Sequence, residues 1–251
     1  MFSLNALLFA FLIGFIPILI WLGFWLLQDR KRPEPKHLIV GAFLLGMLAV
    51  VLVIPLQGFI ASYLNIDIGN LSALNIPLLF VLFLFWAGIE EVFKVLFVFF
   101  IIMRKTAVDE PIDIPIYFIT AALGFAALEN ALFLFGPLND GQMVQGFITG
   151  NLRFIGAVLI HTLSTAIVAS AVAFSFYKGW YARIRWGVVG LVGATIVHAI
   201  FNIALVTTSS DYLLVVFAGV WVGIVVMLLM LEYIKTLQRP AWWKKIFINK
   251  K

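Results

Sequence analysis

Long apolar stretches separated by short polar segments run through the whole sequence of 251 residues. A helix needs about 20 mainly apolar residues to cross the hydrocarbon core of a bilayer. Seven stretches reach that length: 4–27, 38–62, 76–102, 113–135, 147–176, 185–206 and 212–234. The pattern therefore predicts an all-α fold, a polytopic transmembrane helical bundle of seven spans, with room for an interfacial turn at the start of the long fifth stretch.

Basic residues alternate between the loops in a way that orients these spans. Cytoplasmic loops of membrane proteins carry an excess of lysine and arginine. All Lys and Arg residues except Lys94 and Arg153 fall in the first, third and fifth loops and in the tail: Arg30, Lys31, Arg32, Lys36, Arg104, Lys105, Lys178, Arg183, Arg185, Lys235, Arg239, Lys244, Lys245, Lys250 and Lys251. We therefore expect the N-terminus outside and the C-terminus in the cytoplasm.

The composition supports a protein that resides in lipid. Hydrophobic residues make up 64% of the chain, charged residues 12%, and the mean hydropathy is +1.11. Soluble globular domains carry about 25% charged residues. The net charge of +5 then reflects orientation in the membrane and is no nucleic-acid footprint. The expected surroundings are the lipid bilayer, with no nucleic acid as a partner.

The sequence shows no linker and no internal repeat that would divide it. We expect one transmembrane domain over residues 1–251, with a basic cytoplasmic tail at 235–251. Within this tail, residues 241–247 mix tryptophan with lysine as an interfacial anchor does. The chain has no cysteine, which excludes disulfides, thiolate metal sites and a cysteine nucleophile.

Several polar residues lie inside the predicted spans, where an ionisable side chain costs about 2.5–3.5 kcal/mol. They are Glu90, Glu91 and Lys94 on the third stretch, Glu129 and Asn130 on the fourth, Arg153 and His161 on the fifth, and His198 and Asn202 on the sixth. Counted from the cytoplasmic end of each helix, four of them fall in a layer about 6 Å thick near mid-membrane. These four are Glu90, Glu129, His161 and His198. The shared depth predicts one hydrated functional site, although a single Asn130, Asn202 or Arg153 could equally bond helices together.

Two kinds of hydrolytic chemistry suit these residue types. Histidine and glutamate are ligands that zinc accepts while it keeps an open position for water. Without a metal, the neighbouring carboxyl groups of Glu90 and Glu91 cannot both ionise readily in a low dielectric, so they could serve as base and acid. A serine hydrolase is disfavoured, because Ser164 and Thr165 are the nearest hydroxyls to His161 and form no evident triad.

Four motifs in this region carry a family resemblance. Glu90-Glu91-Val92-Phe93-Lys94 resembles a Glu-Glu-x-x-Lys motif, and Phe125 to Asn130 resembles a Phe-x-x-x-Glu-Asn motif. His161 and the segment His198-Ala199-Ile200-Phe201-Asn202 are similar to two later histidine motifs. Together they resemble the PrsW-like intramembrane protease family, of the superfamily of CAAX prenyl endopeptidases. The motifs place the expected catalytic core at about 76–206.

The resemblance implies a membrane-embedded peptidase, proposed to be metal-dependent, in a prokaryotic cell membrane. It implies a membrane-anchored protein or peptide as substrate, since the family's namesake cleaves a membrane-anchored anti-sigma factor. Carried over by motif position, the catalytic residues are Glu90, Glu91, Glu129, His161 and His198. The zinc ligands among them would be Glu91, Glu129, His161 and His198. Lys94, Asn130 and Asn202 would support these residues, and we expect the same of Arg153 from the fifth helix.

Two other functions could use the same polar core. A proton-coupled transporter also needs intramembrane glutamate and histidine, but the sequence shows no inverted repeat and no pair of broken helices. A non-catalytic scaffold or chaperone, like the γ-secretase subunit of the same superfamily, would keep the polar core for assembly.

Overall fold

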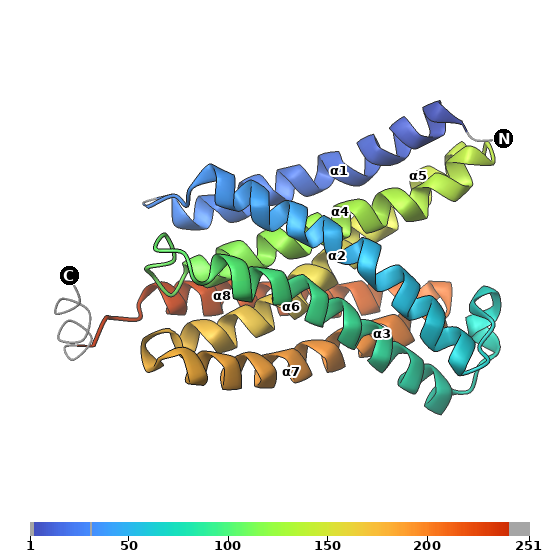
Figure 1. The fold of residues 1–251 in the computed structure, drawn as a ribbon. Coiled ribbons are helices and arrows are strands. Elements are labelled where there is room, and N and C mark those ends of the chain that lie inside the picture. The colour runs from blue at the N-terminus through green and yellow to red at the C-terminus, as the bar shows by residue number, and fades with distance from the viewer. Residues whose placement is uncertain (1–2, 31, 241–251) are drawn as a thin grey trace.

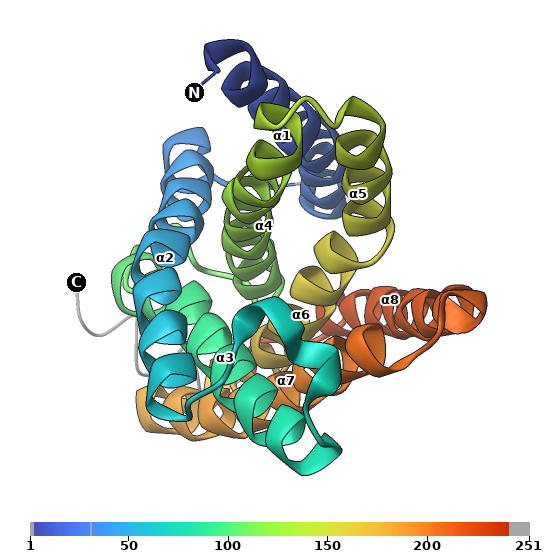
Figure 2. The ribbon, with the colours of Figure 1, turned by 90° about the vertical axis from the view of Figure 1, so that its right-hand side faces the viewer.

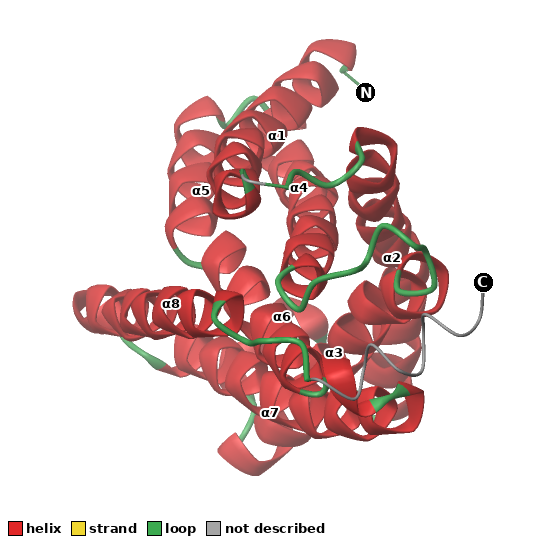
Figure 3. Cartoon of the chain, turned by 90° about the vertical axis from the view of Figure 1, so that its left-hand side faces the viewer, coloured by secondary structure: helices red, strands yellow, loops and turns green. Residues whose placement is uncertain are grey.

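The structure, a computed structural model, describes residues 3–30 and 32–240, which form a bundle of helices without strands in this part of the chain (Figures 1 and 3). The α-helices are α1 (Leu4–Leu26), α2 (Lys36–Tyr63), α3 (Ile76–Phe97), α4 (Asp113–Asn139), α5 (Met143–Ile155), α6 (Ala157–Phe174), α7 (Trp180–Thr207) and α8 (Leu213–Lys235). Short helices extend or connect them: η1 (Leu27–Asp29), η2 (Ile68–Ala73), the π-helix η3 (Val98–Ile102), η4 (Phe176–Lys178) and η5 (Ser210–Tyr212).

Seven segments of these helices are long and apolar enough to span a membrane, which confirms the predicted number. They are Leu4–Asp29, Lys36–Tyr63, Ile76–Ile102, Asp113–Asn139, Met143–Phe174, Trp180–Thr207 and Leu213–Lys235. Large apolar side chains cover their outer surface, for example Ile20, Phe59 and Leu214 at 69%, 69% and 78% exposed. Polar residues such as Glu91 and Lys94 are buried instead. Because this distribution suits a hydrocarbon solvent, the protein is an integral membrane protein.

The fifth span is not one helix. It breaks at Gly156, which separates α5 from α6. The ring of Phe217 on α8 fills the space beside this glycine, only 2.5 Å from where a Cβ would stand. The fifth span therefore begins with a separate helix of 13 residues, α5, which carries Arg153 in its last turn, and the interfacial position of its start stays a prediction.

Helix α4 is the centre of the bundle. It packs against α1, α2, α5 and α6, and the end-on view shows it between these helices (Figure 2). Its backbone touches that of α2 at two glycines: a Cβ on Gly46 would lie 1.9 Å from the carbonyl oxygen of Ala121, and a Cβ on Gly124 2.0 Å from that of Phe43. Small residues permit such close approach in membranes, where packing replaces the hydrophobic drive. The packing fixes α4, which carries Glu129 and Asn130.

The predicted interfacial anchor at 241–247 lies outside the described residues, as does Lys31. The described part of the tail ends at Pro240, five residues after the end of α8.

Candidate active site

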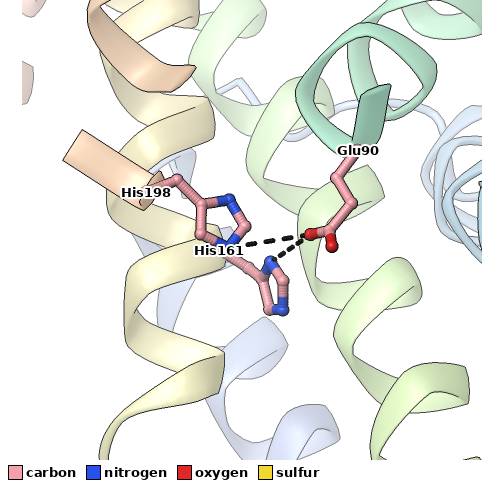
Figure 4. A group of neighbouring side chains, drawn as sticks. All are labelled: Glu90, His161 and His198. Atoms are coloured by element: carbon pink, nitrogen blue, oxygen red, sulfur yellow. Dashed lines mark ion pairs between the residues drawn. The ribbon is translucent and has the colours of Figure 1, made fainter. Parts of the chain in front are cut away.

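Three helices bring Glu90, His161 and His198 together in the interior (Figure 4). Glu90 comes from α3, His161 from α6 and His198 from α7. The Oε2 atom of Glu90 lies 3.8 Å from Nδ1 of His161 and 3.6 Å from Nε2 of His198. The two imidazole rings meet edge to face, with centroids 5.0 Å apart. The predicted convergence of these helices on one polar site is confirmed.

Glu91 lies beside this group and is fully buried. Its carboxylate accepts hydrogen bonds from four side chains. The donors are Lys94 Nζ at 2.5 Å, Ser164 Oγ at 2.8 Å, His198 Nδ1 at 2.8 Å and Thr165 Oγ1 at 3.0 Å. A carboxylate with this many donors is satisfied without a metal, so Glu91 holds His198 in place.

Glu129 on α4 holds the other imidazole. Its Oε2 atom lies 3.0 Å from His161 Nε2 and also accepts a hydrogen bond from Nη2 of Arg153. Arg153 donates from Nε to Asn130 Oδ1 at 2.7 Å, and its guanidinium lies 3.9 Å from the ring centre of Phe133. The break at Gly156 lets α5 present Arg153 to α4 while α6 continues toward the interior.

Each imidazole thus has one nitrogen on a carboxylate and the other directed at Glu90. The ionised carboxylates of Glu91 and Glu129 only accept, which assigns the N–H to His198 Nδ1 and to His161 Nε2. Carboxylates hold metal-binding histidines in the same way, and this fixes the lone pair that faces the metal. In the structure Lys94 Nζ lies 3.1 Å from His161 Nδ1 and donates a hydrogen bond to that lone pair, which a metal ion bound there would replace.

Glu90 has one satisfied oxygen and one unsatisfied oxygen. Its Oε1 accepts a hydrogen bond from Gln57 Nε2 at 2.7 Å, whereas its buried Oε2 has no partner among the described residues. Leaving a buried anionic oxygen without a donor is costly, and the cost disappears when a cation binds it. One ligand atom each from Glu90, His161 and His198 lie within 4.8 Å of one another. The donor set fits zinc.

This geometry favours a different set of metal ligands from the predicted one. The carboxylate oxygen that lies within 4.8 Å of a nitrogen of each imidazole in this group comes from Glu90, and the roles expected for Glu91 and Glu129 as ligands stay predictions. Neighbouring residues on a helix point about 100° apart. The packing of α3 places Glu90 between the two imidazoles, and it places Glu91 between His198 and the hydroxyls of α6.

The remaining predicted residues divide into two groups. Lys94, Asn130 and Arg153 join the hydrogen-bonded network described above. Asn202 is half-buried one turn after His198 and forms no side-chain hydrogen bond with a described residue. Its supporting role stays a prediction.

Three polar residues belong to the network without having been predicted as site residues. Ser164 and Thr165, weighed as nucleophiles, donate to Glu91 and not to an imidazole, which is a further argument against the serine-hydrolase interpretation. Gln57 on α2 was missed altogether. Its signal in the sequence is that it interrupts the apolar stretch 38–62 two residues after Pro55.

The site is more enclosed than the predicted hydrated pocket, because its charged groups bond mainly to one another. Glu90, His161 and His198 have side chains 6%, 3% and 2% exposed. At the edge of the network the side chains of Glu129 and Arg153 are each 17% exposed. Among these five residues, the two at this edge are the most exposed.

A comparison with known families decides between the functions left open by the sequence. The PrsW family of intramembrane metalloproteases matches residues 34–231, which include the whole network. The chain belongs to this family. It is an intramembrane protease, and neither the transporter nor the scaffold interpretation is supported.

Several curated relatives are named protease PrsW. The Bacillus subtilis (strain 168) protein is 26% identical over 199 residues, 78% of this chain and 83% of its own length. The Geobacillus kaustophilus protein is 28% identical over 169 residues, 67% of this chain and 66% of its own. The Clostridioides difficile protein is 31% identical over 137 residues, 54% and 55% of the two chains. No solved structure matches the chain significantly. These bacterial relatives support a bacterial membrane protein.

Proposed function

We propose that Glu90, His161 and His198 hold a zinc ion, and that the protein hydrolyses peptide bonds of membrane-anchored proteins at this site. One observation carries the proposal. The unpartnered Oε2 of Glu90 faces two imidazoles whose opposite nitrogens are already held by carboxylates. Two histidines and one glutamate are a known set for catalytic zinc, and they leave a position open.

The chemistry that zinc supplies in such a set is Lewis acidity toward the scissile carbonyl and toward water. The chain's own groups then orient and move protons. Glu91 and Glu129 keep His198 and His161 in the required tautomers. Oε1 of Glu129 has no hydrogen bond with a described residue and lies at the partly exposed edge. We assign to Glu129 the transfer of a proton from the attacking water to the leaving amine.

Arg153 positions this carboxylate. Arg153 donates one hydrogen bond to Glu129 and one to Asn130, both on α4. These two bonds fix its guanidinium at the edge of the site. A fixed positive charge there also favours the negative charge that develops on the carbonyl oxygen during attack.

The location of the site supports a substrate inside or at the membrane. The network lies in the interior of helices that have the length and composition of membrane spans. The distribution of basic residues supports an N-terminus outside and a C-terminus in the cytoplasm of a bacterial cell. We keep residues 1–251 as one domain, with the core at 76–206 extended by Gln57 from α2.

The test is the zinc content of purified protein together with cleavage. We expect about one zinc per chain in the wild type, and its loss in Glu90→Gln and in His198→Ala. Glu232→Gln is a matched control, because this exposed glutamate on α8 pairs only with Lys235 among the described residues. Cleavage is compared in cells by the membrane-protein fragments that accumulate with each variant. Unchanged zinc content in Glu90→Gln would contradict the ligand assignment, and undiminished cleavage in both site variants would contradict the site.

A further inference from the structure

Three carboxyl groups meet at one end of the bundle, away from the active site. Asp29 ends η1, Glu34 lies in the connection from η1 to α2, and Asp113 is the first residue of α4. Each offers one carboxylate oxygen, and these oxygens lie within 4.8 Å of one another. We call these three residues the acidic triad.

The triad is poorly exposed to water. Asp29 is 7% exposed and Asp113 2%, and Glu34 is half-buried. Like charges at this separation repel strongly where water is excluded, and desolvation adds to the cost. The arrangement therefore requires something that compensates the charge.

The nearby cations that the structure describes have their hydrogen bonds and ion pairs elsewhere. Arg32 pairs with Glu110, and Lys235 pairs with Glu232. Arg183 donates to a backbone carbonyl of η4. Among the described residues, no lysine, arginine or histidine forms an ion pair with the triad.

Hydrogen bonds satisfy the triad only in part. Oδ2 of Asp113 accepts from the backbone N–H groups of Asp109 at 2.8 Å and Glu110 at 2.7 Å. Glu34 accepts from the hydroxyl of Tyr117, and its carboxyl group is also hydrogen-bonded to that of Asp113. Oδ2 of Asp29 is buried and has no partner among the described residues, which leaves an acceptor without a donor in the triad.

We propose that the acidic triad binds a hard divalent cation, Mg²⁺ or Ca²⁺. Carboxylate oxygens alone, without histidine or cysteine, are the ligands that these ions prefer. Water can complete the coordination, because Asp29 also lines an open cavity of about 730 Å³ at this end of the bundle. The proposed ion differs in ligand chemistry from the zinc of the active site.

The ion would join two parts of the chain that are distant in sequence. Asp29 and Glu34 belong to the connection between α1 and α2, and Asp113 starts α4, the central helix that carries Glu129. Bound cation would stabilise the position of α4 by mass action, since unfolded chains do not assemble the three ligands.

The experiment uses the full chain, purified in detergent and freed of metals with a chelator. Its thermal unfolding midpoint is measured during separate titrations with MgCl₂ and CaCl₂. We expect a saturable rise with at least one of the two salts. In Asp29→Asn, which removes one of three ligand charges, the apparent affinity should fall at least about tenfold.

Three further variants make the result specific. Asp140→Asn, an exposed acid at the other end of α4, should respond as the wild type does. His198→Ala should also respond, because it alters only the active site. If Asp29→Asn does not fold, Glu34→Gln takes its place in the same titrations.

A response of the same affinity in Asp29→Asn and the wild type would overturn the proposal, as would no saturable response to either salt. Stabilisation by acid alone, without a response to cations, would also overturn it, because a shared proton would then compensate the triad.

Discussion

Glu91→Gln separates the positioning of an imidazole from the binding of metal. All four partners of the buried Glu91 carboxylate donate to it. Glutamine keeps the shape but loses the charge, and it brings an NH₂ group where the carboxylate only accepted. The hydroxyl of Thr165 can rotate to accept from this NH₂. The amide oxygen then still faces His198 and Lys94, now as a neutral acceptor.

Stability and activity should respond by different amounts. Lys94 is 1% exposed, and removing the partner of a buried charge costs about 3–5 kcal/mol. Losing a carboxylate that orients a metal-binding histidine costs about 10–100-fold in activity, or about 1.4–2.7 kcal/mol in the barrier. The double variant Glu91→Gln/Lys94→Met removes the unpaired ammonium. It should regain much of the stability but not the cleavage.

The assay pairs thermal unfolding of the purified variants with cleavage of a membrane-anchored reporter in liposomes at saturating zinc. Glu90→Gln serves as the reference for loss of a ligand. If cleavage and zinc content in Glu91→Gln fall as far as in Glu90→Gln, Glu91 is itself a ligand. If cleavage by Glu91→Gln is unchanged, the carboxylate of Glu91 does not position His198, and the positioning role is refuted.

Two other changes test the packing and the edge of the site. Gly46→Ala places a Cβ 1.9 Å from the carbonyl oxygen of Ala121 and should cost about 1–3 kcal/mol in unfolding experiments, whereas Gly58→Ala meets nothing within 4 Å and should be neutral. Equal unfolding midpoints would contradict the close contact of α2 with α4. Gln57→Ala removes the donor to Glu90 Oε1 and should lower the zinc affinity about tenfold, as measured by zinc titration. An unchanged affinity would exclude a role of Gln57 in holding Glu90 for the metal.

The sequence by itself determined the helical class, the number of spans and most of the residues that meet in the polar network. Apolar stretches of sufficient length leave the backbone no alternative to helices in lipid. Ionisable side chains are costly to expose to lipid, so rare polar residues at one depth on several spans are expected to meet in the interior of the bundle. For these reasons three of the four residues expected at one depth, Glu90, His161 and His198, lie together in the structure, and Glu129 contacts them through His161.

Only the tertiary structure decided which glutamate lies between the two imidazoles and which ones hold their opposite nitrogens. Glu90 and Glu91 are adjacent, so periodicity cannot say how α3 rotates against α6 and α7. The tertiary structure also placed Gln57 against Glu90. The sequence alone does not indicate which residue a single glutamine in a span will contact. The acidic triad joins residues from separate connections, which no local pattern links. The physical reason is the same in each case. The local sequence determines which segments are apolar and how long each helix is. The rotation of each helix and its contacts depend instead on how all the helices pack together.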